Sequence, residues 1–305
     1  MPYPVFKVPP ENVLESEQLG TKDKFWFRGG FIDSSVESEW LFKFPTEGTG
    51  QHWAEKIAYE IAREMRISAP RVELAEFGLT KGSATVSFTK ANGYELYHGN
   101  QILHGFDSKY EQTKRFRHKA HTVGRIFEAI IGSFRDKKAS DRACTQMAGY
   151  LVLDALICNV DRHHENWGVV RKRKGEGWLG RLAPSYDHAS SLGRELNDTA
   201  TKKNRERYLR ELGVEKYIER GRSPIFITGN EKHGLAPMEL IKSCLKIQGL
   251  SQFFEDGIER LHYLNSAKFE RIISKFPPGW MSELEKEFAI TLLIKTLEQL
   301  NHIQK

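Results

Sequence analysis

The segment NVDRHHENW, residues 159–167, decides the interpretation of this sequence. It follows LDALIC (153–158), a run that is apolar nearly all round a predicted helix, so this helix end should be buried. Six positions of the segment then hold five polar or titratable groups: Asp161, His163, His164, Glu165 and Asn166. A surface loop of this length needs no such density, so we expect the loop to carry chemistry.

Phosphoryl transfer accounts for these groups with few assumptions. A kinase must orient a hydroxyl nucleophile and hold Mg²⁺ against nucleotide phosphates. Asp161 could accept the hydroxyl proton, while Asn166 and Asp187, in APSYDHASSL (183–192), offer the hard oxygen ligands that Mg²⁺ prefers. The Asp-x₄-Asn spacing equals that of the protein-kinase catalytic loop.

Outward from this loop, the pattern is mainly helical. A small hairpin is predicted at 168–172 and 177–183, and long helices at 111–133 and 138–158. The chain from about 203 to its end is predicted to be mostly helical, with breaks at Gly221, Pro224, Pro277 and Pro278.

The first third of the chain has a different character. Strands are predicted at 24–31, 39–44, 71–77 and 83–89, with one amphipathic helix at 51–65. We therefore expect an α+β, two-lobed fold of the protein-kinase type. Residues 1–92 would form a small strand-rich lobe and residues 93–305 a larger helical lobe.

The strand-rich lobe contains candidate residues for binding a nucleotide. Lys43 lies inside the apolar strand EWLFKF, where a lysine needs either a partner or a function, although it could also extend to solvent from an edge strand. Glu55 on the following helix is its candidate partner, with Glu60 a second choice. The stretch LGTKDKF (19–25) could cover phosphates with Lys24 adding charge, but Gly20 is its only glycine.

Composition bounds the remaining possibilities. The 305 residues are 39% hydrophobic and 28% charged, with three widely spaced cysteines that suit reduced core thiols. Without a secretion-type signal or a long apolar run, we expect a cytoplasmic protein. The net charge of +6 is concentrated in basic runs at 115–121, 171–174 and 202–210, which could meet an acidic partner. No aromatic ladder accompanies these runs, so direct nucleic-acid binding is not expected. No membrane-binding amphipathic stretch is evident, so membrane binding is not expected either.

Five segments together resemble the HipA-like serine/threonine kinases, in particular compact members that lack an extra N-terminal subdomain. They are LGTKDKFWF (19–27), EWLFKFP (39–45), EKIAYEIAREMRISAPRVEL (55–74), LDALICNVDRHHENWGVV (153–170) and LAPSYDHASSL (182–192). The resemblance covers about residues 15–195 and is most specific at 151–192.

This resemblance implies a role for each matching position. Asp161 would be the catalytic base, and Asn166 and Asp187 would bind Mg²⁺. Gly20, Thr21 and Lys24 would form the phosphate loop over ATP. Lys43, paired with Glu55, would bind the ATP phosphates. Phe88, Thr89 and Lys90 would surround the adenine. The resemblance also implies a protein substrate with a Ser or Thr acceptor and a small helix-turn-helix antitoxin as partner.

One position departs from the family pattern. Several members carry a regulatory serine three residues before the phosphate-loop glycine, where this chain has Glu17 beside Ser16. Inhibitory autophosphorylation at this position is therefore not expected here, and Glu17 could mimic a phosphoserine.

Three alternatives stay open from the sequence. A metal-dependent phosphohydrolase would use His163, His164 and Glu165 with Asp187 and His188, and would have no use for Lys43. A nucleotide-binding pseudokinase would keep the fold without transfer. A small-molecule or lipid kinase would use the same loop with another acceptor.

Overall fold

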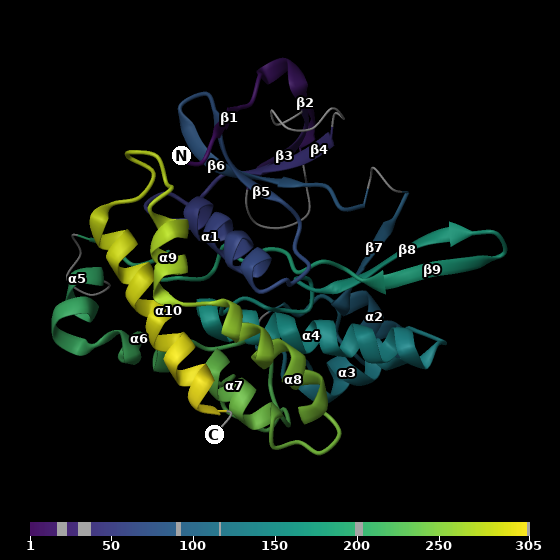
Figure 1. The fold of residues 1–305 in the computed structure, drawn as a ribbon. Coiled ribbons are helices and arrows are strands. Elements are labelled where there is room, and N and C mark those ends of the chain that lie inside the picture. Colours follow the sequence, from purple (N-terminus) through teal and green to yellow (C-terminus); the bar gives the residue numbers. More distant parts are fainter. Residues whose placement is uncertain (17–22, 30–37, 90–92, 116, 199–203, 304–305) are drawn as a thin grey trace.

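The computed structural model describes residues 1–16, 23–29, 38–89, 93–115, 117–198 and 204–303. A sheet-bearing lobe lies above a larger helical lobe (Figure 1), which confirms the predicted α+β, two-lobed class. The predicted division at residue 92 falls within residues 90–92, which lie outside the described part, so it stays a prediction.

In the described part of the first lobe, strands pair in the order β1-β5-β6-β4-β3-β2. Their bounds are β1 Val5–Lys7, β2 Val13–Ser16, β3 Lys24–Gly29, β4 Ser38–Lys43, β5 Val72–Phe77 and β6 Thr80–Val86. The central strands β3 to β6 match the four predicted strands. The added strands β1 and β2 precede the first predicted strand.

Side chains alternate between the two faces of this sheet. One face forms an aromatic core that contains Phe25, Phe27, Trp40 and Phe42. The opposite face is covered by helix α1, Gln51–Glu64, which contacts β5 and β6 and also helix α9. The apolar positions of α1 belong to the same apolar cluster as the helices of the second lobe, so α1 connects the two lobes.

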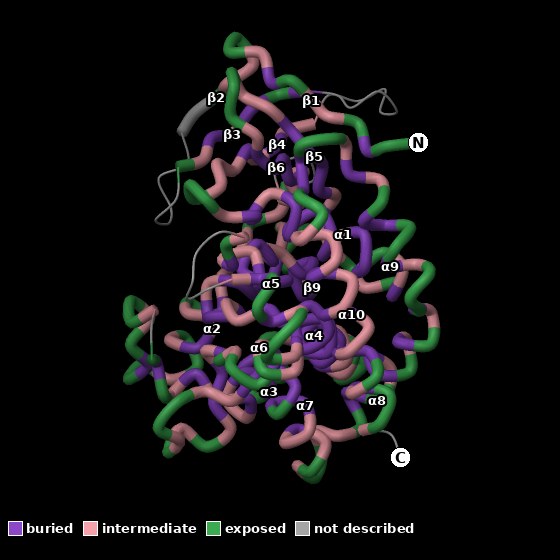
Figure 2. Tube along the Cα trace, turned by 90° about the vertical axis from the view of Figure 1, so that its left-hand side faces the viewer, coloured by how far each residue is buried: buried purple, intermediate pink, exposed green. Residues whose placement is uncertain are grey.

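The second lobe is built around α4, Lys137–Ile157, which Figure 2 shows as a buried helix at its centre. Its last turn, Leu153–Ile157, is buried, as its apolar character predicted. The other helices are α2 Gly99–Phe106, α3 Val123–Gly132, α5 Arg205–Arg207, α6 Val214–Arg220, α7 Pro237–Cys244, α8 Ser251–Glu259, α9 Ser266–Ile273 and α10 Glu283–Ile303.

A second sheet belongs to the helical lobe. Strands β7 Glu95–His98, β8 Gly168–Lys174 and β9 Gly177–Leu182 pair in that order, and the β8–β9 hairpin projects from the body (Figure 1). The sequence predicted the hairpin but not β7 or α2.

The predicted helix at 111–133 is wrong over its first half, since only Val123–Gly132 is helical. The Thr122 hydroxyl accepts a hydrogen bond from the Arg125 N–H and so begins the helix there. Upstream, His118 Nε2 bonds to the Glu111 carbonyl at 2.9 Å and Arg117 has a φ of +52°. These local bonds and the left-handed residue replace the expected helical turns.

No helix in the described ranges is both long enough and apolar enough to cross a bilayer.

Candidate active site

The loop after α4 is bonded back to the helix from which it emerges. Helix α4 ends at Cys158, which has a left-handed φ of +51°. The next residue, Asn159, donates from Nδ2 to Asp154 Oδ1 at 2.8 Å and from its backbone to the Asp154 carbonyl at 2.8 Å. The loop that carries Asp161 therefore starts from a fixed point on a buried helix.

Arg162 connects this loop to the segment that carries Asp187. Its side chain is 1% exposed and donates to both carboxylate oxygens of Asp154, at 2.8 and 2.7 Å. It also donates to the Asn166 carbonyl at 2.7 Å, to Ser185 Oγ at 2.9 Å and to the Tyr186 carbonyl at 3.2 Å. Burial alone would lower the pKa of Arg162, but the Asp154 carboxylate outweighs it and raises the pKa.

Sequence reasoning did not single out Arg162 or Asp154. Their signal was a carboxylate within the apolar end of a helix, followed eight residues later by an arginine. A buried charge needs a partner, so this pair was detectable in principle.

Asp161 and Asn166 are brought together as predicted. Asn166 Nδ2 donates to the Asp161 carbonyl at 2.7 Å, which fixes the amide and leaves Oδ1 as its acceptor atom. The Ser190 hydroxyl donates to Asp161 Oδ2 at 3.2 Å. The Asp161 side chain is 31% exposed, so its carboxylate is accessible to solvent, whereas Asn166 is buried.

Asp187 has a strained backbone and contacts the other lobe. Its φ of +59° lies in the left-handed region, which is uncommon for residues other than glycine and is found at functional sites. Lys43 Nζ lies 3.1 Å from Asp187 Oδ1 and 3.8 Å from Glu55 Oε2. The neighbouring His188 N–H donates to Glu55 Oε1 at 3.0 Å. A strand, a helix and the Asp187 segment therefore meet at one cluster.

The charges of this cluster stabilise one another. Burial alone would lower the pKa of Lys43, but the carboxylates of Asp187 and Glu55 raise it above its ordinary value. Burial alone would likewise raise the pKa of Glu55, but Lys43 and the His188 hydrogen bond lower it. Lys43 is therefore a cation and Glu55 an anion at neutral pH.

Lys24 stands directly across from Lys43. The two residues are partners in the antiparallel β3–β4 register, so their side chains share the face of the sheet opposite the aromatic core. Two like charges opposite each other are destabilising unless an anion lies nearby. The carboxylates of Asp187 and Glu55 already lie near the Lys43 ammonium group. Phosphate groups would offset the positive charge of both lysines.

Phe88 follows β6 and reaches the Asp187 segment. Its ring stacks on Tyr186 with centroids 5.5 Å apart and an interplanar angle of 30°. The Tyr186 hydroxyl in turn donates to the Glu165 carbonyl at 2.8 Å. Phe88 is thus packed against the segment that carries Asp187. The remaining candidates Gly20, Thr21 and Lys90, and also Glu17, lie outside the described residues.

The two adjacent histidines, His163 and His164, form hydrogen bonds that hold the loop in place. His163 Nε2 accepts from Arg115 Nε at 3.1 Å, and the hydroxyl of Tyr110 lies 2.9 Å from His164 Nδ1. Burial, with Arg115 adding to it, lowers the pKa of His163 to about 3. Within the described ranges, no three His, Cys, Asp or Glu side chains form a group that could hold a metal ion. The phosphohydrolase alternative therefore gains no support from these histidines.

The comparison with protein families agrees with this geometry. Residues 18–231 match the model of the HipA-like C-terminal domain. The chain belongs to this family. No curated protein matches it.

Two solved structures resemble the family member described here. The Helicobacter pylori proinflammatory kinase CtkA is 18% identical, with a TM-score of 0.77 over 99% of this chain and 98% of CtkA. HipA of Shewanella oneidensis, solved with HipB and operator DNA, is 15% identical, with a TM-score of 0.61 over 97% of this chain and 68% of that chain. At these identities the likeness establishes a kinase-like fold.

Proposed function

We propose that this HipA-like protein is an ATP- and Mg²⁺-dependent serine/threonine protein kinase. The observation that carries the proposal is the Lys43 cluster, in which one lysine lies 3.1 Å from Asp187 and 3.8 Å from Glu55. The family membership and the likeness to the kinase CtkA support the same function.

Each residue has a role in this mechanism. Lys43, held by Glu55, would bind nucleotide phosphates, and Lys24 would add positive charge on the same face of the sheet. Phe88 would contact the base. Asp161 would accept the proton of the acceptor hydroxyl as the hydroxyl oxygen bonds to the γ-phosphorus and the bond to ADP breaks.

The residues present fit a magnesium ion. Asn166 keeps an amide oxygen for a ligand because its nitrogen is engaged, and the Asp187 carboxylate is 33% exposed beside Lys43. Mg²⁺ bound to these hard oxygens would offset the negative charge of the phosphates. Arg162 would keep both ligands at a fixed separation because it bonds to the backbone of Asn166 and of Tyr186.

Labelled phosphate tests the proposal. The purified protein would be incubated with Mg²⁺ and γ-labelled ATP, alone and with cell lysate, beside Asp187→Ala and an Asp141→Ala control from the exposed side of α4. A labelled protein band that needs Asp187 but not Asp141 is the expected result. ATP binding without a labelled protein would instead favour a small-molecule kinase or a pseudokinase.

We also propose a small helix-turn-helix antitoxin as partner and toxin activity for this chain. The support is the family and the solved complex of Shewanella HipA with HipB and DNA. Growth arrest on expression, relieved by a neighbouring small gene product, is the expected result, and growth unaffected by active protein would contradict it.

A further inference from the structure

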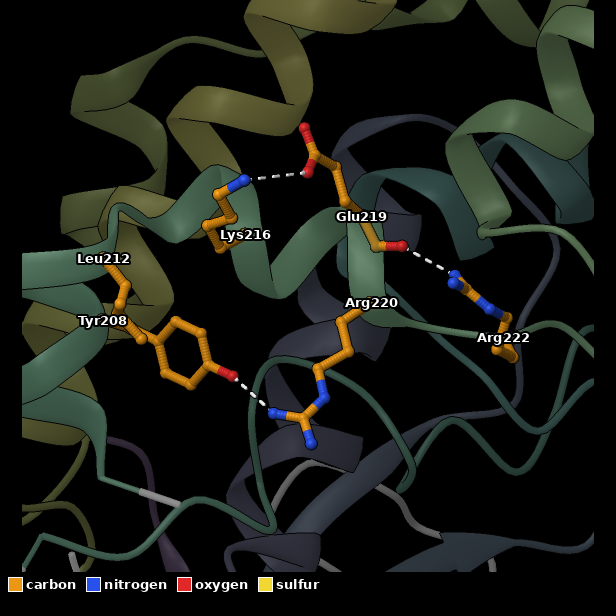
Figure 3. Close-up of a pocket in the computed structure, with 6 residues that line it drawn as sticks. All are labelled: Tyr208, Leu212, Lys216, Glu219, Arg220 and Arg222. Atoms are coloured by element: carbon orange, nitrogen blue, oxygen red, sulfur yellow. Dashed lines mark hydrogen bonds and ion pairs between the residues drawn. The ribbon is translucent and has the colours of Figure 1, made fainter. Parts of the chain in front are cut away.

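A hollow of about 420 Å³ lies on the helical lobe (Figure 3). It is formed by the irregular turn Tyr208–Leu212 and helix α6. The residues that line it are Tyr208, Leu212, Lys216, Glu219, Arg220 and Arg222.

The hollow borders the loop that carries Asp161. Arg220 and Arg222 flank Gly221, and a Cβ atom on Gly221 would lie 3.1 Å from Cγ1 of Val160, the residue before Asp161. The two arginines therefore sit where this segment packs on the candidate catalytic loop. A protein whose hydroxyl reaches Asp161 would pass its neighbouring residues close to them.

Within the described residues, neither of these arginines has a carboxylate partner. Arg220 Nη1 donates to the Tyr208 hydroxyl at 3.0 Å, as Figure 3 shows, and Arg222 Nη1 donates to the carbonyls of Glu219 and Gly221 at 2.6 and 2.8 Å. Neither forms an ion pair with any residue in the described part of the chain. Their charges are available to a partner.

The basic run predicted at 202–210 behaves differently. Lys202 and Lys203 lie outside the described residues, and Arg205 is buried. Arg207 is paired with Glu211 at 3.1 Å, and Arg210 with Glu287 at 2.7 Å. Among the described residues of this segment, the arginines without a carboxylate partner are thus Arg220 and Arg222, which lie beyond the basic run that the sequence singled out.

We propose that this hollow binds carboxylate side chains of the acceptor protein, close to the hydroxyl that is phosphorylated. The inference rests on the proposed kinase function. Guanidinium groups present several N–H donors in a plane that matches a carboxylate, and both arginines retain donors beyond their present bonds. Lys216, at the same hollow, adds a third positive charge, which lies 3.9 Å from Glu219.

Binding without turnover tests the inference separately from the kinase function. The probe is a fluorescein-labelled glutamate-rich peptide with a central serine, beside its glutamine counterpart, measured by anisotropy without ATP at about 50 mM salt. The variant is Arg220→Gln with Arg222→Gln. The matched control, Arg207→Gln with Arg210→Gln, removes the same charge from the same segment but at paired arginines. Circular dichroism would check that both variants are folded.

We expect the Arg220→Gln, Arg222→Gln variant to bind the glutamate peptide roughly five- to tenfold more weakly than the parent, and the control to change affinity less than about twofold. Equal losses in both variants, or equal binding of the glutamine peptide, would overturn the inference. So would a single-stranded RNA that displaces the peptide and binds the same hollow more tightly, because the hollow would then serve nucleic acid.

A kinetic readout completes the test where the peptide is phosphorylated. The variant should raise KM for the peptide and leave kcat nearly unchanged, since the arginines position the acceptor and do not touch the transferred group. If the peptide binds in the hollow but no phosphate is ever transferred to protein, the kinase proposal fails while the docking site stands.

Discussion

Lys43 and Asp187 are 144 positions apart in the sequence, yet Nζ of Lys43 lies 3.1 Å from Oδ1 of Asp187. Glu55 shares the same ammonium group at 3.8 Å. This contact joins the strand-rich lobe to the helical lobe at the proposed nucleotide site. A ligand that separates the two charges would have to replace Asp187 as a partner of Lys43, and phosphate oxygens with a bound cation can do so.

Replacing Lys43 should weaken both nucleotide binding and folding. Lys43→Met leaves Glu55 buried without a cation, which costs about 3 kcal/mol of unfolding free energy. Adding Glu55→Gln to Lys43→Met should recover part of that loss, because the orphaned charge is removed. Urea unfolding would measure the loss of stability, and ATP titration would measure the loss of nucleotide affinity. Unchanged ATP affinity in a folded Lys43→Met protein would show that Lys43 does not bind the nucleotide.

Replacing Asp161 should stop transfer and spare binding. Asp161→Ala removes the proposed base, so kcat should fall by about 10²- to 10⁴-fold while the Kd for ATP stays near that of the parent. Asp141→Ala, an exposed carboxylate on α4 paired with Lys137, is the matched control. Full transfer by the Asp161 variant would end the proposed mechanism.

Arg162 should be among the most costly residues to remove. Arg162→Met strands the buried Asp154 carboxylate and releases Asn166, Ser185 and Tyr186, so we expect a loss of about 3 to 5 kcal/mol in unfolding free energy. The double change Arg162→Met with Asp154→Leu should be less destabilised than the single one. Chemical denaturation of both variants distinguishes this buried ion pair from a surface contact, whose loss would cost under about 1 kcal/mol.

Stability should decline in mild acid because the buried His121 and the half-buried His52 are neutral in the folded protein. Burial lowers the pKa of His121 to about 3 and that of His52 to about 4, from a usual 6.5. The unfolded chain therefore binds more protons below pH 6.5, so the free energy of unfolding falls as the pH drops from about 6.5 toward 4. His52→Gln should have a shallower dependence than the parent in urea titrations across this range. A parent protein equally stable at pH 6.5 and 4.5 would refute the assignment.

Local patterning was sufficient for several elements. Strands β3 to β6, helix α1, helix α4 and the β8–β9 hairpin match their predicted positions because each combines a clear apolar period with turn residues at its ends. Strand β7 is short and half-exposed, and it exists because Leu96 and Tyr97 pair with Val170 and Val169 far along the chain. The helix predicted before α3 was wrong because the side chain of His118 bonds to the nearby Glu111 carbonyl and that of His121 to the distant Pro224 carbonyl. Apolar period alone reveals neither contact.

The sequence by itself determined the chemistry available to this protein: an Asp-x₄-Asn loop after a buried helix, a second Asp beyond a hairpin, and a lysine inside an apolar strand. Those features are local, so composition and spacing carry them. The contacts across the fold follow from tertiary structure alone: Lys43 meets Asp187, and Arg162 bonds the two segments together. Among the described residues, Arg207 and Arg210 have carboxylate partners whereas Arg220 and Arg222 have none. Ion pairing depends on distances across the fold between residues remote in sequence, and Coulomb energy between charges changes steeply with that separation.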